Sequence, residues 1–142
     1  MKKLIEMLRK HEGVETHAYK CTSGKLTIGC GRNIDQAGGL GLSQDEIDYL
    51  LTNDIKRVTA ELEKAFPWFS VLDEVRRHAL IDLCFNLGLT RLMRFRLALR
   101  AMENQDYETA SKEFLHSKWA KQVGTRSITI TDMIMSGKHS NQ

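Results

Sequence analysis

The stretch EGVETHAYKCTSGKLTIGCG, residues 12–31, joins two kinds of local structure. Before it, four apolar side chains recur at helical spacing: Leu4, Ile5, Met7 and Leu8. This spacing predicts a short amphipathic helix that ends near Gly13. Within the stretch, Tyr19 and residues 26–28 favour strands, and residues 22–25 between them predict a hairpin turn. A helix followed by a small β element therefore opens the chain.

The segment after this β element is rich in glycine. Five glycines fall between Gly29 and Gly41, which predicts an irregular loop. Ser43 and Glu46 then have the spacing of a capping box, and apolar residues follow them at helical spacing. Together they predict a helix of about five turns over residues 43–63.

The remainder of the chain is predicted to form a series of helices. One contains residues 75–84 and is expected to end with Gly88 in the left-handed conformation. Three more are expected to begin at N-caps and to end near a second residue: Thr90 to Glu103, Asp106 to Ser117, and Thr125 to Ser136. Gly137 is expected to close the last one.

These elements predict an α+β fold class. A small N-terminal β lobe covers about residues 13–42, a linking helix about 43–63, and a larger helical lobe about 64–142 together with the first helix. The chain has no internal repeat and no Gly/Ser linker, so residues 1–142 are expected to form a single domain. A cleft between the two lobes is the expected ligand site.

Composition and charge exclude several classes of protein. A chain of 142 residues has the size of one domain, and 42% hydrophobic with 27% charged residues is typical of a globular protein. The net charge of +3 is too small to hold a nucleic acid at physiological salt. The apolar runs are too short to cross a bilayer, and Glu6 and Arg9 interrupt the segment where an export signal needs apolar residues.

The cysteines and histidines predict no metal site and no cofactor. Cys21, Cys30 and Cys84 are an odd number at wide spacing, which fits neither a disulfide framework nor a zinc site. Cys30 and Cys84 fall in apolar stretches, which favours packed thiols. The five histidines are scattered without the spacing of a metal-binding pair.

Glu12 is a candidate catalytic acid because it falls where the helix ends and the β element begins. A carboxyl group held partly out of water there would keep its proton and could protonate a leaving-group oxygen, as in glycoside cleavage. A glutamate at a helix end is more often only a solvated charge, so its neighbours decide between the two interpretations. Eight residues separate Glu12 from Cys21, five more separate Cys21 from Thr27, and Gly29-Cys30-Gly31 follows.

This pattern resembles the phage-type lysozymes, or endolysins. That family carries Glu-Gly at the end of its first helix, an Asp after eight residues, and after five more a Thr in a Thr-(Ile/Val)-Gly-x-Gly segment. Further matching segments lie along the chain: Leu42-Ser43-Gln44-Asp45-Glu46, Phe85-Asn86-Leu87-Gly88, Trp119 and Arg126. The resemblance implies a lysozyme-like fold, in which a long helix joins two lobes and the wall polysaccharide binds between them.

The resemblance also implies a glycoside hydrolase that cleaves the β-1,4 bond between N-acetylmuramic acid and N-acetylglucosamine in peptidoglycan, usually with inversion. Glu12 would be the acid, residue 21 would hold or activate the attacking water, and Thr27 would help to place it. The family has Asp where this chain has Cys21, and an ordinary thiol with a pKa of about 8.5 is only about 3% thiolate at pH 7. If Lys20 or Lys25 lowers the pKa of this thiol, Cys21 could be a base, or a nucleophile that gives retention. Otherwise the attacking water has no general base at residue 21.

Five further residues are candidates through the same resemblance. Phe85 and Asn86 would face the cleft and contact the sugar, and Asn33 would lie at its lip. Arg126 would stand near the catalytic glutamate and favour its carboxylate form. Arg32 occupies the position where many relatives have His, which predicts a rearranged ion pair. Two simpler interpretations stay open: Phe85 as a core residue and Arg126 as a helix surface charge.

The expected partners follow from the resemblance and from charge. Peptidoglycan is the expected substrate, reached from the host cytoplasm once a holin-like membrane protein has opened the membrane, and the protein is expected to be a monomer. No nucleic-acid partner is expected, because no recognition motif is present. Four arginines crowd residues 91–100, either as a solvated helix surface or as a face that attracts the anionic wall or lipopolysaccharide.

Two alternative functions stay open because of Cys21. One is a non-catalytic relative that binds the wall through a retained cleft. The other is a lytic transglycosylase, which needs one acid and no base for water, and which forms an anhydro product.

Overall fold

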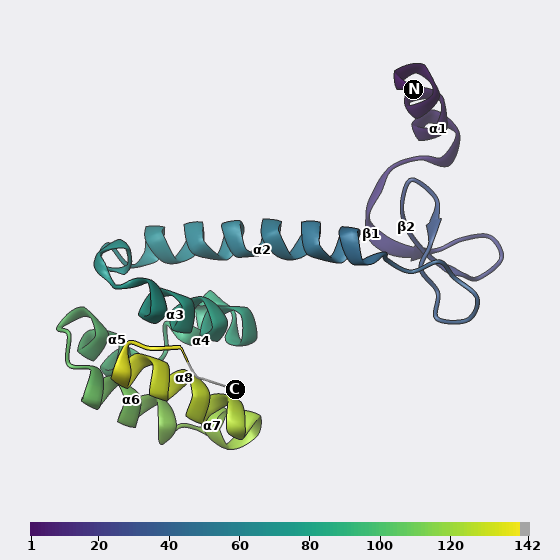
Figure 1. The fold of residues 1–142 in the computed structure, drawn as a ribbon. Helices are drawn as coiled ribbons and strands as arrows, with labels where there is room; N and C mark the ends of the chain where they lie inside the picture. Colours follow the sequence, from purple (N-terminus) through teal and green to yellow (C-terminus); the bar gives the residue numbers. More distant parts are fainter. Residues whose placement is uncertain (140–142) are drawn as a thin grey trace. The chain divides into compact units, whose positions relative to one another are not determined.

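The N-terminal part of the chain forms one helix and a small antiparallel sheet (Figure 1). Its elements are α1 (Lys2–Glu12), β1 (Glu15–Lys20), β2 (Leu26–Gly29) and β3 (Arg32–Asn33). The strands are ordered β1-β2-β3, and Thr27 of the central strand lies opposite Tyr19 on one side and Asn33 on the other. With the helices that follow, this sheet confirms the predicted α+β class.

The predicted first helix and the predicted hairpin are confirmed, and two details of the prediction are corrected. β1 begins at Glu15, four residues before Tyr19, the first residue with a strand signal in the sequence. β3 lies inside the segment that was predicted to be an irregular loop. This short strand forms because the free edge of β2 supplies partners: Ile28 pairs with Arg32, and the Ile34 N–H donates to the Leu26 carbonyl oxygen at 2.9 Å.

The long helix α2 spans Gln44–Ala65 and begins with the predicted capping box. The Ser43 N–H donates to Oε1 of Glu46 at 2.9 Å, and the Glu46 N–H donates to Oγ of Ser43 at 3.3 Å. These two bonds satisfy N–H groups that the first turn of a helix leaves without partners. Near the other end of α2, Val58 and Leu62 are buried.

The computed structural model describes residues 1–139, and residues 140–142 of the predicted helical lobe lie outside this range. The chain divides into two compact units, one of residues 1–51 and one that begins at Thr52, so the boundary falls inside α2. The division places α1 in the first unit. The single domain, the cleft between the lobes and the place of the first helix in the helical lobe stay predictions.

The second unit is helical (Figure 1). After α2, the part of this unit that the structure describes contains a 3-10 turn and six helices: η1 (Phe69–Val71), α3 (Glu74–Leu87), α4 (Leu89–Leu92), α5 (Arg96–Glu103), α6 (Tyr107–Leu115), α7 (Lys118–Val123) and α8 (Thr125–Ser136). Helix α8 packs against α3, α6 and α7. Within the described residues, no helix is both long enough and apolar enough to span a membrane.

Several predicted helix ends in this unit are corrected. Thr90 is not an N-cap but lies inside the one-turn helix α4, which starts directly after Gly88. Gly88 has φ 78° and ψ 157°, which is not the left-handed helical conformation. The helix predicted to end near Ser117 ends at Leu115, and Ser117 instead caps the separate helix α7 by accepting from the Ala120 N–H at 3.3 Å.

Other helix ends are confirmed. Asp106 caps α6 by accepting from the Thr109 N–H at 3.2 Å, and Gly137 ends α8 in the left-handed conformation. The N-cap of α8 is Gly124, one residue before the predicted Thr125. No side chain caps this end of α8, so the prediction based on Thr125 placed the start of the helix one residue too late.

The core of the second unit is built from aliphatic and aromatic side chains. Phe69, Phe114 and Trp119 are buried, and Trp68 and Phe95 pack against this core. Cys84 is buried as predicted, whereas Cys30 is exposed and therefore not a packed thiol. The sequence around Cys30 is apolar, but the residue lies outside the strands, at the turn that leads from β2 to β3.

One arginine ties α3 to the end of α8. Nε of Arg76 donates to the Ile134 carbonyl oxygen at 2.6 Å, and Nη2 donates to the Met135 carbonyl oxygen at 3.0 Å. The guanidinium also lies over the ring of Tyr107, 3.6 Å from its centroid. A cation at the carbonyl end of a helix is favourable, so Arg76 fixes the two helices that carry Asn86 and Arg126.

Candidate active site

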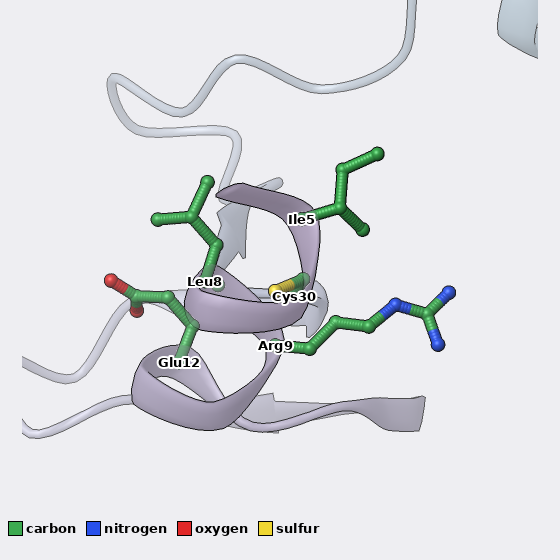
Figure 2. Close-up of a pocket in the computed structure, with 6 residues that line it drawn as sticks. Ile5, Leu8, Arg9, Glu12 and Cys30 are labelled. Carbon is green, nitrogen blue, oxygen red and sulfur yellow. The ribbon is translucent and has the colours of Figure 1, made fainter. Parts of the chain in front are cut away.

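Glu12 is the last residue of α1 and lines a shallow hollow in the first unit. The hollow has a volume of 390 Å³ and is formed with Ile5, Leu8, Arg9, Cys30 and Gly31 (Figure 2). Figure 2 shows the Glu12 carboxyl group and the Arg9 guanidinium pointing away from each other. The Glu12 side chain is exposed in the structure, which contradicts the partial exclusion of water that its position suggested.

The Glu12 carboxyl group lies against the backbone of Gly31. A β-carbon at residue 31 would lie 2.7 Å from Oε2 of Glu12 and 3.2 Å from its carboxyl carbon, and Gly31 has φ +73°. Only glycine fits both this backbone conformation and this close approach without displacing the carboxyl group. The second glycine of the Gly-x-Gly segment, Gly31, therefore leaves the space that the carboxyl group of the candidate acid occupies.

Cys21 lies in the hairpin turn and is surrounded by hydrogen-bond donors. Its Sγ is 3.1 Å from Oγ of Ser23. The pKa of the Cys21 thiol is lowered to about 7, mainly by the Ser23 hydroxyl and then by the backbone N–H groups of Lys25 and Ser23. Donors that favour the charged form lower the pKa of an acid. The cause is therefore not the lysine charge that the sequence suggested, since the Lys25 ammonium donates to the Ala37 carbonyl oxygen at 3.2 Å.

Thr27 lies close to Cys21 in the same hairpin. It is 4% exposed, and its hydroxyl donates to the Lys25 carbonyl oxygen at 2.9 Å. The Thr27 hydroxyl also contributes to the lowered pKa of Cys21, although less than the other donors. The structure therefore brings Cys21 and Thr27 together, as the resemblance implied, and fixes the Thr27 hydroxyl within the turn.

Arg32 forms the rearranged ion pair that its position predicted. Its Nη1 lies 2.6 Å from Oε1 of Glu46 and donates to the Gly41 carbonyl oxygen at 3.1 Å. The pair holds the pKa of Glu46 at about 2, with further help from the Ser43 N–H. The sequence identified Glu46 only as a capping residue, because the 14-residue separation from Arg32 carries no local signal.

Asn33 organises the glycine-rich loop. Its Oδ1 accepts from the Asp35 N–H at 2.9 Å, and its backbone carbonyl oxygen accepts from the Leu40 N–H at 2.8 Å. Asp35 in turn accepts from the N–H groups of Leu26 and Ala37, which lower the pKa of its carboxyl group. This arrangement was not predicted from the sequence, although Asn and Asp two residues apart are typical of side chains that hydrogen-bond to nearby backbone. A sugar contact by Asn33 stays a prediction.

Phe85 and Asn86 lie at the end of α3 in the second unit. Phe85 is 39% exposed, which excludes its interpretation as a core residue. Oδ1 of Asn86 accepts from Nε1 of Trp119 at 2.6 Å, so the buried indole fixes the orientation of the amide. An exposed aromatic side chain next to an oriented amide can bind an N-acetyl sugar, and this sugar contact stays a prediction.

Arg126 has a partner that the sequence analysis missed. Its Nη2 lies 2.7 Å from Oδ1 of Asp82, and its Nε donates to the same oxygen at 2.8 Å. Both residues belong to the second unit and are partly exposed. Arg126 is exposed in the first turn of α8, which agrees with its interpretation as a helix surface charge, and its expected place near the catalytic glutamate stays a prediction.

The arginine-rich segment of residues 91–100 is exposed at its charged positions: Arg91, Arg94, Arg96 and Arg100. None of these arginines forms an ion pair with a described residue, whereas Lys112 pairs with Glu108 at 3.1 Å. Among residues 1–139, no group of three or more His, Cys, Asp or Glu side chains is placed to hold a metal ion.

Comparison with known proteins identifies related chains. The family model described as Phage lysozyme matches residues 9–131. The chain is 31% identical to an endolysin of Acyrthosiphon pisum secondary endosymbiont phage 1, over 82% of this chain and 77% of that protein. It is 27% identical to probable T4-type lysozyme 1 of Dictyostelium discoideum over 93% of both chains. It is also 27% identical to the pre-baseplate central spike protein Gp5 of Enterobacteria phage T4, over 94% of this chain and 28% of that protein.

Proposed function

Since this chain belongs to the phage lysozyme family, a family of glycosidase-type enzymes that hydrolyse peptidoglycan, we propose that it cleaves the β-1,4 bond between N-acetylmuramic acid and N-acetylglucosamine. One observation supports this proposal above the others. The three motif residues lie in one unit, with the Glu12 carboxyl group against Gly31 and the Cys21 thiol beside Thr27 in a turn that favours its charged form.

In the proposed reaction, Glu12 is the general acid. Its carboxyl group donates a proton to the glycosidic oxygen as the bond from that oxygen to the anomeric carbon breaks. A water molecule attacks the anomeric carbon from the opposite face and gives a proton to the Cys21 thiolate. The Thr27 hydroxyl oxygen accepts a hydrogen bond from the same water and orients it. Inversion at the anomeric carbon is the expected outcome.

The lowered pKa of Cys21 makes the thiolate available for this role. With a pKa of about 7, about half of the Cys21 side chains carry charge at neutral pH, compared with about 3% for an ordinary thiol with a pKa of about 8.5. A thiolate is also a strong nucleophile, so attack by Sγ itself on the anomeric carbon is the competing route. That route forms a covalent glycosyl-enzyme and retains the anomeric configuration.

Digestion of purified peptidoglycan, followed by mass and anomeric analysis of the products, tests the proposal. The wild type should release fragments with a free reducing end as α-anomers. Glu12→Gln should release none, whereas Glu15→Gln makes the same charge change at an exposed residue of β1 and should remain active. Cys21→Ser should be strongly impaired, because a serine hydroxyl is not ionised at this pH.

Each other product distribution points to a different mechanism. β-Anomers would identify Cys21 as a nucleophile, and anhydro products would identify a lytic transglycosylase. No products from the wild type, together with retained binding to the wall, would identify a non-catalytic relative.

We further propose that the enzyme lyses the bacterial host for phage release, acting as a monomer on the periplasmic wall after a holin-like partner opens the membrane from the cytoplasmic side. The similarity to a phage endolysin supports this role. The relatives in Dictyostelium and in a phage baseplate indicate that the same domain serves other settings, so the role needs its own test. Expression in bacteria should cause lysis only when a holin is expressed with it, and light scattering should give a mass near 16.2 kDa. Lysis without a holin would contradict this route.

A further inference from the structure

The hairpin turn that carries Cys21 has a fixed backbone. The Cys21 N–H donates to the Lys25 carbonyl oxygen at 2.9 Å, and the Gly24 N–H donates to the Cys21 carbonyl oxygen at 2.8 Å. These two bonds hold the turn between β1 and β2 closed from both sides. Residues 21 and 23 are thereby held with their side chains on the same side of the turn, where Sγ and Oγ are 3.1 Å apart.

We infer that Ser23 is a positioning residue of this active site: its hydroxyl holds the Cys21 side chain in one orientation and donates a hydrogen bond to the thiolate. The inference rests on the proposed function, because it assigns Ser23 to the chemistry of Cys21. Ser23 itself touches neither the sugar nor the attacking water in the proposed reaction. It acts through the sulfur atom.

Two observations favour Ser23 over the other neighbours of the thiol. First, its hydroxyl is the largest cause of the lowered pKa of Cys21, ahead of the backbone N–H groups that every residue type would supply. Second, the Thr27 hydroxyl donates to the Lys25 carbonyl oxygen at 2.9 Å, and of the groups that lower the pKa of Cys21 it contributes least. Of the two side chains that hydrogen-bond to the Cys21 thiol, Ser23 therefore contributes more than Thr27.

The lowered pKa of Cys21 is not explained by nearby charged groups. The cations nearest to Cys21 along the chain are Lys20 and Lys25, and no charge interaction contributes to the lowered pKa of the thiol. The carboxylate of Asp35 accepts from the N–H groups of Leu26 and Ala37 and does not contribute to the lowered pKa of the thiol. Hydrogen bonds within the turn therefore decide how much thiolate is present, and salt should have little effect on it.

Alkylation of Cys21 by iodoacetamide, measured as a function of pH and resolved by peptide mass spectrometry, tests the inference directly. Removing the Ser23 hydroxyl in Ser23→Ala should move the midpoint from near pH 7 to near pH 8, so alkylation near pH 7 should slow about fivefold. Near pH 10, where the thiol is fully ionised, both rates should agree. Ser23→Thr should keep the wild-type midpoint, because it retains the hydroxyl.

The chain supplies two controls for this experiment. Cys30 is exposed, and its alkylation in the same digests should be identical in all variants. Thr22→Ala changes the exposed neighbour in the same turn and should leave the Cys21 midpoint unchanged. An unchanged Cys21 midpoint in Ser23→Ala would overturn the inference while leaving the proposed hydrolysis in place.

The pH profile of peptidoglycan hydrolysis connects the thiol to the reaction. If the thiolate is required, the rate rises with pH through the thiol midpoint, and Ser23→Ala should shift this rise to higher pH without lowering the plateau. A shifted alkylation midpoint with an unshifted activity profile would overturn the positioning role. A wild type that hydrolyses no peptidoglycan would instead refute the proposed function. Wild-type hydrolysis is therefore measured before the Ser23 variants are compared.

Discussion

Gly31→Ala is expected to impair catalysis by displacing the Glu12 carboxyl group. The new β-carbon would lie 2.7 Å from Oε2 of Glu12, and reaching the 3.4 Å of ordinary contact needs a movement of about 0.7 Å. The exposed Glu12 side chain can make this movement by rotating. Because a misplacement of about 1 Å at a reacting group can cost about 100-fold in rate, we expect kcat to fall about 10- to 100-fold.

Gly29→Ala is the matched control for this experiment. Gly29 has φ +69°, close to the +73° of Gly31, but a β-carbon there would have no atom within 4 Å. An alanine in this region of backbone conformation costs about 1–2 kcal/mol at either position. The two variants should therefore lose similar stability against urea, and only Gly31→Ala should lose most of its kcat.

The assay is the release of dye from labelled peptidoglycan at saturating substrate, well below the unfolding temperature of both variants. Equal loss of kcat in the two variants would mean that backbone strain, and not contact with Glu12, limits the reaction. Wild-type kcat in a folded Gly31→Ala would refute the close approach of the carboxyl group to residue 31.

Three other predictions follow from single contacts. The pKa of Glu46 is about 2, compared with an ordinary value of 4.5. The ion pair with Arg32 therefore stabilises the fold above pH 4.5, and this stabilisation is lost as the pH falls toward 2. Glu46→Gln should flatten this part of the pH dependence of the thermal unfolding midpoint. Trp119→Phe removes the hydrogen bond to Asn86 and part of a buried ring, and should cost about 1–2 kcal/mol in urea unfolding. Cys21→Asp restores the residue type that the family carries at this position. It should keep hydrolysis while removing the rise in rate near pH 7, because a carboxylate is already charged below that pH.

The parts of the fold that the sequence predicted well are those with local signals. The glycine after α1 and the capping box of Ser43 and Glu46 depend on residues that are at most a few positions apart, and both are confirmed. The break between α4 and α5 was missed, because the apolar spacing of residues 89–102 continues through it. Strand β3 was missed because two residues have no pattern of their own and become a strand only by pairing with β2.

For the candidate site too, the features with local sequence signals were predicted and those that depend on distant residues were not. The spacing of Glu12, Cys21 and Thr27 identified the motif, and the structure places Cys21 beside Thr27. The partners of the other site residues were missed because they are distant in sequence: Trp119 lies 33 residues from Asn86, and Asp82 lies 44 residues from Arg126. Ser23 is close in sequence to Cys21, but a serine in a turn is expected for the turn alone, so nothing marked its hydroxyl as a partner of the thiol.

The chemistry at residue 21 is therefore set by the turn more than by the residue type. The turn directs the Ser23 hydroxyl and two backbone N–H groups toward one side chain, and donors of this kind stabilise any anion there. A carboxylate would be charged at neutral pH without them, whereas a thiol needs them to become charged. The hydrogen bonds of the turn therefore supply a thiolate near neutral pH, which the proposed reaction requires of residue 21.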